Sequence, residues 1–140
     1  MTRQPDPSRI TLKRVYDTAS PKDGVRILVD RLWPRGLSRD AAAIDFWIKD
    51  VAPSAALRQW FGHRPERWVE FRKRYKSELA RRPQALAEIQ SLAKKGRITL
   101  LFAAHDEHHN NAVVLCELLR AKESPLRASK TKVTRTRGGR

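Results

Sequence analysis

The sequence predicts an α/β domain with a small, mainly parallel sheet of about four strands and helices packed on it. Three observations lead to this fold class. Short runs rich in Val, Ile and Leu, such as 98–104, alternate with segments whose apolar residues recur at helical spacing. Proline and glycine separate these segments. Strands that alternate with helices usually lie parallel, because each intervening helix returns the chain to the same edge of the sheet.

The first two predicted strands cover residues 10–16 and 25–32. Apolar and polar residues alternate in the first strand, as in a strand with one solvated face. The second is rich in Val, Ile and Leu, which is typical of a strand buried on both faces. Turn-forming residues at 20–24 separate the two. Pro34 ends the second strand, because proline has no N–H to donate to a neighbouring strand.

Residues 39–51 are expected to form a short helix and then a short strand. Ser38 is a good N-cap for a helix over 39–43, because its hydroxyl oxygen can accept a backbone N–H. The apolar residues from Ile44 to Val51 fit both helical spacing and strand alternation. We favour a strand over 45–51.

Three helices are predicted between this strand and the buried run at 98–104. Ser54 caps the first helix and Gly62 ends it. Pro65 starts the second helix, because proline is favoured in a first turn, and Pro83 ends it. The third ends at a glycine that follows two lysines, which suit the negative end of the helix dipole.

The remaining elements are a buried strand over 98–104 and a final helix after the polar run 105–111. The last residues of the chain are mostly Ser, Thr, Lys, Arg and Gly, which offer little to bury. The predicted organisation is therefore a loose leader at 1–9, one domain at 10–121 and a disordered basic tail at 122–140.

Composition indicates a basic protein of a reducing compartment. Lys and Arg number 30 against 15 Asp and Glu, a net charge of +15 over 140 residues. This charge favours an anionic small ligand, or nucleic acid bound without sequence preference by residues 122–140. The alternative is a basic protein with no such partner. The single cysteine, Cys116, cannot form an internal disulfide, and no apolar run has the length of a membrane span. We expect a cytoplasmic protein with no membrane partner.

Two clusters of polar residues occur where predicted strands end. The first, at 30–36, contains Asp30, Arg31 and Arg35, and the second, at 105–110, contains three histidines, two acids and an asparagine. Ligands of open α/β sheets bind beyond the carboxyl ends of the strands. We therefore expect the two clusters to lie side by side and to line one solvent-accessible pocket.

His109, Asp30 and Asp106 are the catalytic candidates. An imidazole suits general acid–base catalysis near neutral pH, which favours His109. A carboxylate at a buried strand end is costly unless it is paired. Asp30 is therefore either a general base or a metal-binding carboxylate, or it forms a structural ion pair with Arg31 or Arg35. Asp106 either assists His109 or, like its neighbour Glu107, caps the final helix.

Arg31 and Arg35 are the candidates for binding an anion, because a guanidinium group can clamp a phosphate or carboxylate with two hydrogen bonds. The alternative is pairing with nearby carboxylates. Trp33, Asn110 and His63 are further candidates for ligand contacts, although a tryptophan beside a strand is more often part of the core. The histidine spacing matches no metal motif, so we expect no metal site, and the sequence identifies no cofactor.

The run from Arg26 to Gly36, which ends in Trp-Pro-Arg-Gly, resembles the hallmark of the YeaO-like proteins of domain-of-unknown-function family 488. Shorter segments that also match are 51–54, 60–63, 65–68, 106–107 and 109–110. The resemblance covers residues 10–121 and implies a small α/β domain without an established activity. Arg64 and Phe102 depart from the pattern, because similar proteins usually have Asp and Tyr there. His105 and His108 also depart, since a cation and an acid are common at their positions. A helix cap at 64 and a phenol at 102 are therefore not carried over.

Three functional interpretations remain open at this stage. The first is an enzyme acting on a phosphorylated or otherwise anionic ligand, such as a nucleotide or a piece of nucleic acid. The second is a non-catalytic module that binds such a ligand in the pocket at the strand ends. The third is a basic nucleic-acid-associated protein whose polar clusters are structural.

Overall fold

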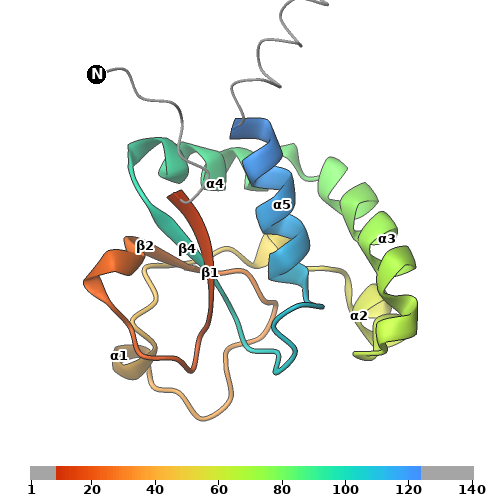
Figure 1. Cartoon of the computed structure of the whole chain (residues 1–140), viewed down its shortest axis with the longest axis horizontal. Coiled ribbons are helices and arrows are strands. Elements are labelled where there is room, and N and C mark those ends of the chain that lie inside the picture. The colour runs from red at the N-terminus through yellow and green to blue at the C-terminus, as the bar shows by residue number, and fades with distance from the viewer. Residues whose placement is uncertain (1–8, 124–140) are drawn as a thin grey trace, which may run out of the picture.

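A four-stranded parallel sheet lies at the centre of the computed structural model, which describes residues 9–123 (Figure 1). The strands are β1 (Ile10–Arg14), β2 (Val25–Leu28), β3 (Phe46–Trp47) and β4 (Ile98–Phe102). Their order is β1-β4-β2-β3, and every neighbouring pair is parallel. The predicted α/β class with a parallel sheet is confirmed.

Five α-helices connect or follow these strands. They are α1 (Arg39–Ala42), α2 (Ala55–Phe61), α3 (Trp68–Ala80), α4 (Pro83–Lys95) and α5 (Asn111–Glu123). Short 3-10 turns at Pro21–Asp23, Lys49–Val51 and Pro65–Arg67 precede β2, α2 and α3. None of the helices within residues 9–123 has both the length and the apolar character of a membrane span.

Strand β4 is the most buried of the four, because it lies between β1 and β2. All five of its residues are buried. Ile98 aligns with Ile10 of β1 and with Val25 of β2, so the three strands start in register. Their carboxyl ends therefore reach the same edge of the sheet, and the segments that follow them meet there.

The two faces of the sheet are covered unequally. Helices α2 to α5 pack on one face, where Ile27, Leu100 and Phe102 join a large buried cluster with side chains of those helices. The other face carries a smaller cluster that contains Leu28 and Leu101 and is covered by α1 and the loop before it. Figure 1 shows this separation, with α1 on the opposite side of the strands from α3 and α5.

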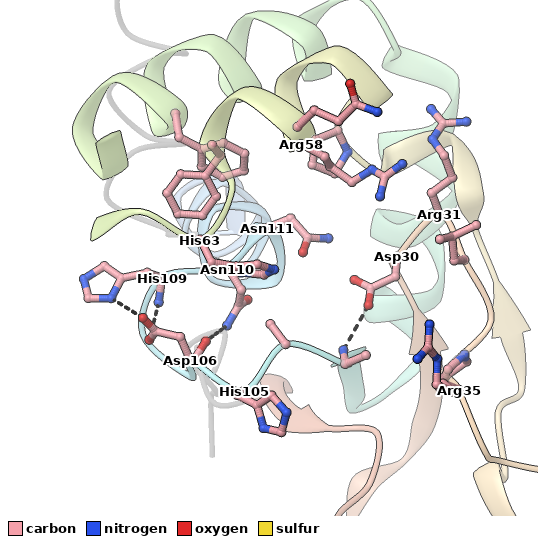
Figure 2. Close-up of a pocket in the computed structure, with 18 of the residues that line it drawn as sticks. Asp30, Arg31, Arg35, Arg58, His63, His105, Asp106, His109, Asn110 and Asn111 are labelled. Atoms are coloured by element: carbon pink, nitrogen blue, oxygen red, sulfur yellow. Dashed lines mark hydrogen bonds and ion pairs between the residues drawn. The ribbon is translucent and has the colours of Figure 1, made fainter. Parts of the chain in front are cut away.

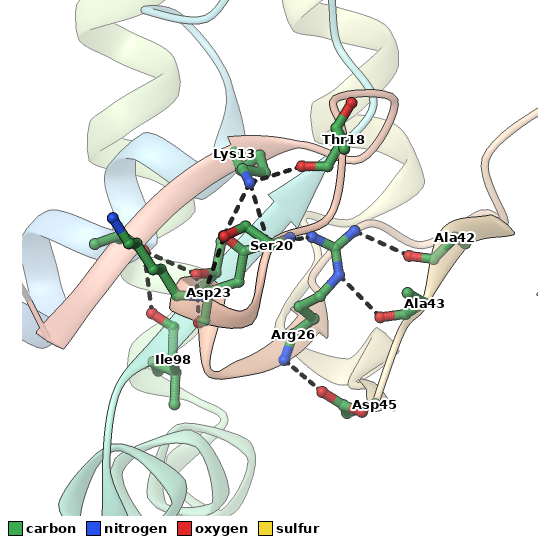
Figure 3. Close-up of polar contacts among 12 residues, drawn as sticks. Lys13, Thr18, Ser20, Asp23, Arg26, Ala42, Ala43, Asp45 and Ile98 are labelled. Atoms are coloured by element: carbon green, nitrogen blue, oxygen red, sulfur yellow. Dashed lines mark hydrogen bonds and ion pairs between the residues drawn. The ribbon is translucent and has the colours of Figure 1, made fainter. Parts of the chain in front are cut away.

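A closed polar network links Lys13 of β1 to the amino-terminal end of β2 (Figure 3). Asp23 accepts hydrogen bonds from Lys13 Nζ at 2.9 Å, from the Ser20 N–H at 3.0 Å and from Arg26 Nη1 at 2.6 Å. The other guanidinium nitrogens of Arg26 donate to the carbonyl groups of Ala42 and Ala43, which end α1. Arg26 is only 4% exposed. This network fixes α1 against the sheet with every charge paired.

The predicted strands are longer than the observed ones. Strand β2 ends at Leu28 rather than Leu32, because the chain turns toward α1 once the ladder with β4 is complete. The strand favoured over 45–51 is reduced to Phe46–Trp47 and is followed by a 3-10 turn. Ser38 and Ser54 cap α1 and α2 as predicted.

Helix α5 continues to Glu123. Its last two residues therefore belong to the segment 122–140 that we expected to be a basic tail. The remainder of that segment, and the expected leader except for Arg9, lie outside the described residues.

Candidate functional site

A pocket of about 740 Å³ lies at the carboxyl-end edge of the sheet (Figure 2). Its walls come from the segments after β1, β2 and β4, from α2 and from the start of α5. Small organic ligands usually bind in pockets of about 300–1,000 Å³. The pocket therefore has the size and position of a ligand site in an open parallel sheet.

Every side chain that the sequence singled out for a site lines this pocket. These residues are Asp30, Arg31, Trp33, Arg35, His63, Asp106, His109 and Asn110. The two polar clusters at 30–36 and 105–110 therefore meet at one pocket, as the parallel strands require. Figure 2 shows the first cluster on one side of the pocket and the pair formed by Asp106 and His109 on the other.

Asp30 presents a half-buried carboxylate to the pocket. Its Oδ2 accepts a hydrogen bond from the Ala103 N–H at 2.9 Å, which links the segments after β2 and β4. Burial raises the pKa of Asp30. The Ala103 N–H, the Asn111 side chain and the charge of Arg58 oppose this rise without cancelling it. Ionised Asp30 is therefore less stable than an exposed aspartate would be.

Three arginines line the same pocket: Arg31, Arg35 and Arg58. Within residues 9–123, none of their guanidinium groups forms a hydrogen bond or an ion pair, and the Nε atoms of Arg31 and Arg58 are buried without a partner. The ion pair between Asp30 and a neighbouring arginine, which was the structural alternative, is thus not formed. Leaving a buried donor unbonded costs about 1–3 kcal/mol. The pocket therefore holds hydrogen-bonding capacity that the described part of the chain does not use.

Asp106 and His109 form a polar pair on the opposite side of the pocket. Asp106 Oδ1 accepts the backbone N–H groups of His108 and His109 at 2.9 and 3.1 Å, and Oδ2 lies 2.9 Å from His109 Nδ1. The His108 N–H and then the His109 ring hold the pKa of Asp106 below its ordinary value. A carboxylate beside Nδ1 favours a proton on that nitrogen and leaves Nε2 as an acceptor.

The imidazole of His109 also packs against α3. Its ring meets Trp68 edge to face, with 5.1 Å between the ring centroids. The ring of His109 is thus fixed by the carboxylate of Asp106 and the indole of Trp68.

Within residues 9–123, no group of three or more His, Cys, Asp or Glu side chains gathers closely enough to hold a metal ion.

Asn110 is committed to the local structure. Its Oδ1 accepts the N–H of Val113 at 3.0 Å, and its Nδ2 donates to the carbonyl oxygen of Asp106 at 2.9 Å. Asn110 therefore caps α5, whereas the sequence predicted Asp106 or Glu107 for this role. Asp106 instead stabilises the turn that precedes the helix. The side chain of Asn110 is almost fully buried, at 4% exposed for the residue.

Trp33 and His63 lie at the pocket in different environments. Trp33 packs edge to face on Trp47, with 5.4 Å between the ring centroids, and donates its indole N–H to the carbonyl oxygen of Leu37 at 2.7 Å. It belongs to the smaller apolar cluster. His63 is exposed, follows the left-handed Gly62 that ends α2, and itself has a positive φ of 58°. His63 is therefore the more accessible of the two side chains.

The comparisons with known proteins identify a family. A family model described as "Inactive DUF488-N3 subclade" matches residues 9–133. The chain belongs to this family. The uncharacterized protein YeaO of Escherichia coli is 44% identical to this YeaO-like DUF488 chain over 112 residues, which cover 80% of the chain and 97% of YeaO. The uncharacterized protein Rv3073c of Mycobacterium tuberculosis is 42% identical over 115 residues, covering 82% and 97% of the two chains. No solved structure matches.

Arg58 and Asn111 are among the residues of the pocket of this DUF488 protein that sequence reasoning missed. Arg58 follows Leu57 and precedes Phe61 by one helical turn, so it occupies the edge of the buried face of α2. An arginine at the edge of the buried face of a helix was the sequence feature that could have predicted a pocket residue here. Asn111 donates to the carbonyl oxygen of Val29 at 3.0 Å and thus joins α5 to the chain just before Asp30. Only the packing of α5 on the sheet reveals that contact.

Proposed function

We propose that this protein is a non-catalytic binding module that holds a small ligand with a phosphate or carboxylate group in the pocket at the carboxyl ends of its strands. One observation carries the proposal: Arg31, Arg35 and Arg58 line one pocket, and no described residue accepts a hydrogen bond from their guanidinium groups. Three like charges at one site repel one another unless an anion offsets them.

The arginines elsewhere in the fold support this reading. Those whose guanidinium groups donate to a carbonyl or carboxylate oxygen include Arg9, Arg14, Arg26, Arg64, Arg67, Arg72, Arg74, Arg82 and Arg120. The fold thus provides partners for arginines in many environments, including buried ones. Guanidinium groups bind phosphate and carboxylate in a bidentate geometry, which makes an oxyanion the fitting partner for the three in the pocket.

Two observations favour binding over catalysis. The matching family is described as inactive. In addition, Figure 2 shows the ring of His109 directed away from Asp30, Arg31 and Arg35, on the far side of the pocket. A general acid or base must come within hydrogen-bonding reach of the reacting group. A ligand group held by the arginines would lie far from the imidazole.

Catalysis is the second candidate, because the contact between His109 and Asp106 has the arrangement of a base oriented by a carboxylate. In that case Nε2 of His109 would accept a proton from a ligand that spans the pocket. Substituting His109→Ala separates the two candidates. Turnover of a phosphorylated ligand by the wild type that this substitution abolishes, with ligand affinity retained, would establish an enzyme.

Calorimetric titration with inorganic phosphate and with adenosine 5′-monophosphate tests the proposed function. The double variant Arg35→Gln/Arg58→Gln is expected to bind the tighter of the two at least about 10-fold more weakly, because each lost charged hydrogen bond weakens binding substantially. Arg64→Gln/Arg74→Gln is the matched control, since both arginines are exposed, pair with Glu66 and Glu70, and do not line the pocket. Equal affinities in the wild type, the double variant and the control would overturn the proposal.

A further inference from the structure

Asp30 occupies the anion pocket together with the three arginines, although its charge has the same sign as the proposed ligand group. None of the three neutralises it by an ion pair within the described residues. An anion bound to the arginines would therefore lie near a second, half-buried negative charge. Two such charges in one pocket repel each other unless the ligand also offers hydrogen-bond donors to the carboxylate.

We propose that Asp30 accepts hydrogen bonds from sugar hydroxyl groups of the ligand whose phosphate group binds the arginines. The ligand is then a phosphorylated sugar, free or as part of a nucleotide. This inference rests on the proposed function of the pocket and specifies its ligand. Asp30 is a specificity-determining residue in this arrangement, and it selects against a bare phosphate.

The contacts of Asp30 leave room for this role. A carboxylate has about four acceptor positions. The Ala103 N–H bonds Oδ2, and the Asn111 side chain is the other neutral group that acts on the carboxylate. Figure 2 shows the carboxylate directed toward the interior of the pocket, between Asn111 and the arginines. Acceptor capacity therefore remains available to a ligand.

The dimensions of the pocket agree with a ligand larger than a simple oxyanion. A volume of about 740 Å³ exceeds the space of a single phosphate group and lies within the range for organic ligands, about 300–1,000 Å³. Carboxylates at the carboxyl-end edge of parallel sheets bind ribose hydroxyl groups in the dinucleotide-binding folds. The same chemistry is available here, since Asp30 follows β2 directly after Val29.

The test compares ligands that differ only in the sugar. Methyl phosphate, ribose 5-phosphate and adenosine 5′-monophosphate are titrated into the wild type, Asp30→Asn and Asp40→Asn. We expect the wild type to bind at least one of the two sugar phosphates about 10- to 100-fold more tightly than methyl phosphate, because hydrogen bonds to a charged group are strong. Asp30→Asn should remove most of that preference, and it should not weaken the binding of methyl phosphate. Asp40 is exposed on α1 and does not line the pocket, so its variant should match the wild type.

The outcomes separate this inference from the proposed function. Suppose that methyl phosphate and both sugar phosphates bind equally well, and that Arg35→Gln/Arg58→Gln weakens the binding of all three. The pocket then binds anions, but Asp30 forms no hydrogen bonds with the sugar. If Asp30→Asn binds every ligand more tightly than the wild type does, and the wild type takes up a proton when a ligand binds, the inference is also overturned, because Asp30 then only opposes the ligand charge. If no ligand binds the wild type, the proposed function itself fails. The ligand preference of the wild type tests the inference even if Asp30→Asn does not fold.

Discussion

The two edges of the sheet contain the same kinds of charged side chains in opposite states. At the amino-terminal edge, Asp23 and Arg26 are buried, and their ion pair of 2.6 Å is completed by Lys13 and backbone groups. At the carboxyl-end edge, Asp30 and its neighbour Arg31 form no ion pair within residues 9–123. The chain therefore pairs Asp23 with Arg26, where the pair supports the fold, but does not pair Asp30 with Arg31 at the pocket.

The two aspartates report this difference through opposite pKa shifts. Burial alone would raise the pKa of Asp23, but hydrogen bonds from Lys13, the Ser20 N–H and Arg26 outweigh burial and hold it below its ordinary value. Burial raises the pKa of Asp30, and the fewer groups around it do not reverse that rise. Burial thus has different consequences depending on whether the surrounding chain supplies partners. An unsatisfied buried group at a pocket is a reason to look for a ligand.

The largest effect is expected from breaking the closed network with Asp23→Ala. Removing one partner of a buried ion pair destabilises a protein by about 3–5 kcal/mol, because the remaining charge stays buried. Here the remaining charge is that of Arg26, which keeps only carbonyl partners. Urea denaturation followed by tryptophan fluorescence measures the change. A loss no larger than that of an average surface substitution would contradict the structural role of the network.

A bound ligand should supply partners to the charged side chains at the carboxyl-end edge, as the chain itself does for Asp23 and Arg26 at the amino-terminal edge. A ligand that binds only the folded state at 100 times its dissociation constant adds about 2.7 kcal/mol to the free energy of unfolding. We expect the tightest phosphate ligand to raise the melting temperature of the wild type but not that of Arg35→Gln/Arg58→Gln. Chloride at matched ionic strength controls for screening, and Arg64→Gln/Arg74→Gln controls for the loss of two positive charges. Equal stabilisation of the double variant would indicate a general salt effect.

The sign of the Asp30 shift predicts how Asp30→Asn changes stability with pH. A raised folded-state pKa means that the stabilising contribution of Asp30 is complete below the ordinary pKa of 3.8 and is lost as pH rises through the raised value. At neutral pH the buried charge opposes folding. Asp30→Asn should therefore raise the free energy of unfolding at neutral pH, and the gain should disappear under acidic conditions. Denaturation curves over a series of pH values measure both.

Asp23→Asn provides the opposite control for that experiment. The pKa of Asp23 is lowered, so its contribution is present above 3.8 and is lost as pH falls through the lowered folded-state value. Asp23→Asn should destabilise the protein at neutral pH, and the difference should shrink on acidification. Parallel pH profiles for the two variants would show that the two edges do not differ as described.

The smallest effect on stability is expected from Arg35→Gln. Arg35 is exposed and forms no side-chain hydrogen bond or ion pair within the described residues. Its replacement should change the free energy of unfolding by no more than about 0.5 kcal/mol, as is usual for surface positions without partners. The same urea experiment measures this change beside that for Asp23→Ala. A large loss would show that Arg35 supports the fold, and the comparison between the edges would weaken.

The order of the elements and the members of both polar clusters could be read from the sequence. Apolar runs identified β2 and β4, serine caps marked α1 and α2, and parallel topology placed 30–36 and 105–110 at one edge. Element ends were less accurate, because the ladder between β2 and β4 covers only Val25 to Leu28, whereas apolar residues continue beyond it at Val29 and Leu32. The prediction of a catalytic or binding role for the individual residues stays a prediction.

The sequence by itself determined which residues follow each strand, since strand and helix spacing depend on local patterns of apolar and polar side chains. Only the tertiary structure decided which of those residues have partners. Asp23 pairs with Arg26, which also donates to the carbonyl group of Ala42 at the end of α1. Asn110 caps α5, and Arg58 of α2 lines the pocket. Hydrogen bonds and ion pairs require donor and acceptor atoms within a few ångströms, and the positions of distant segments fix those separations.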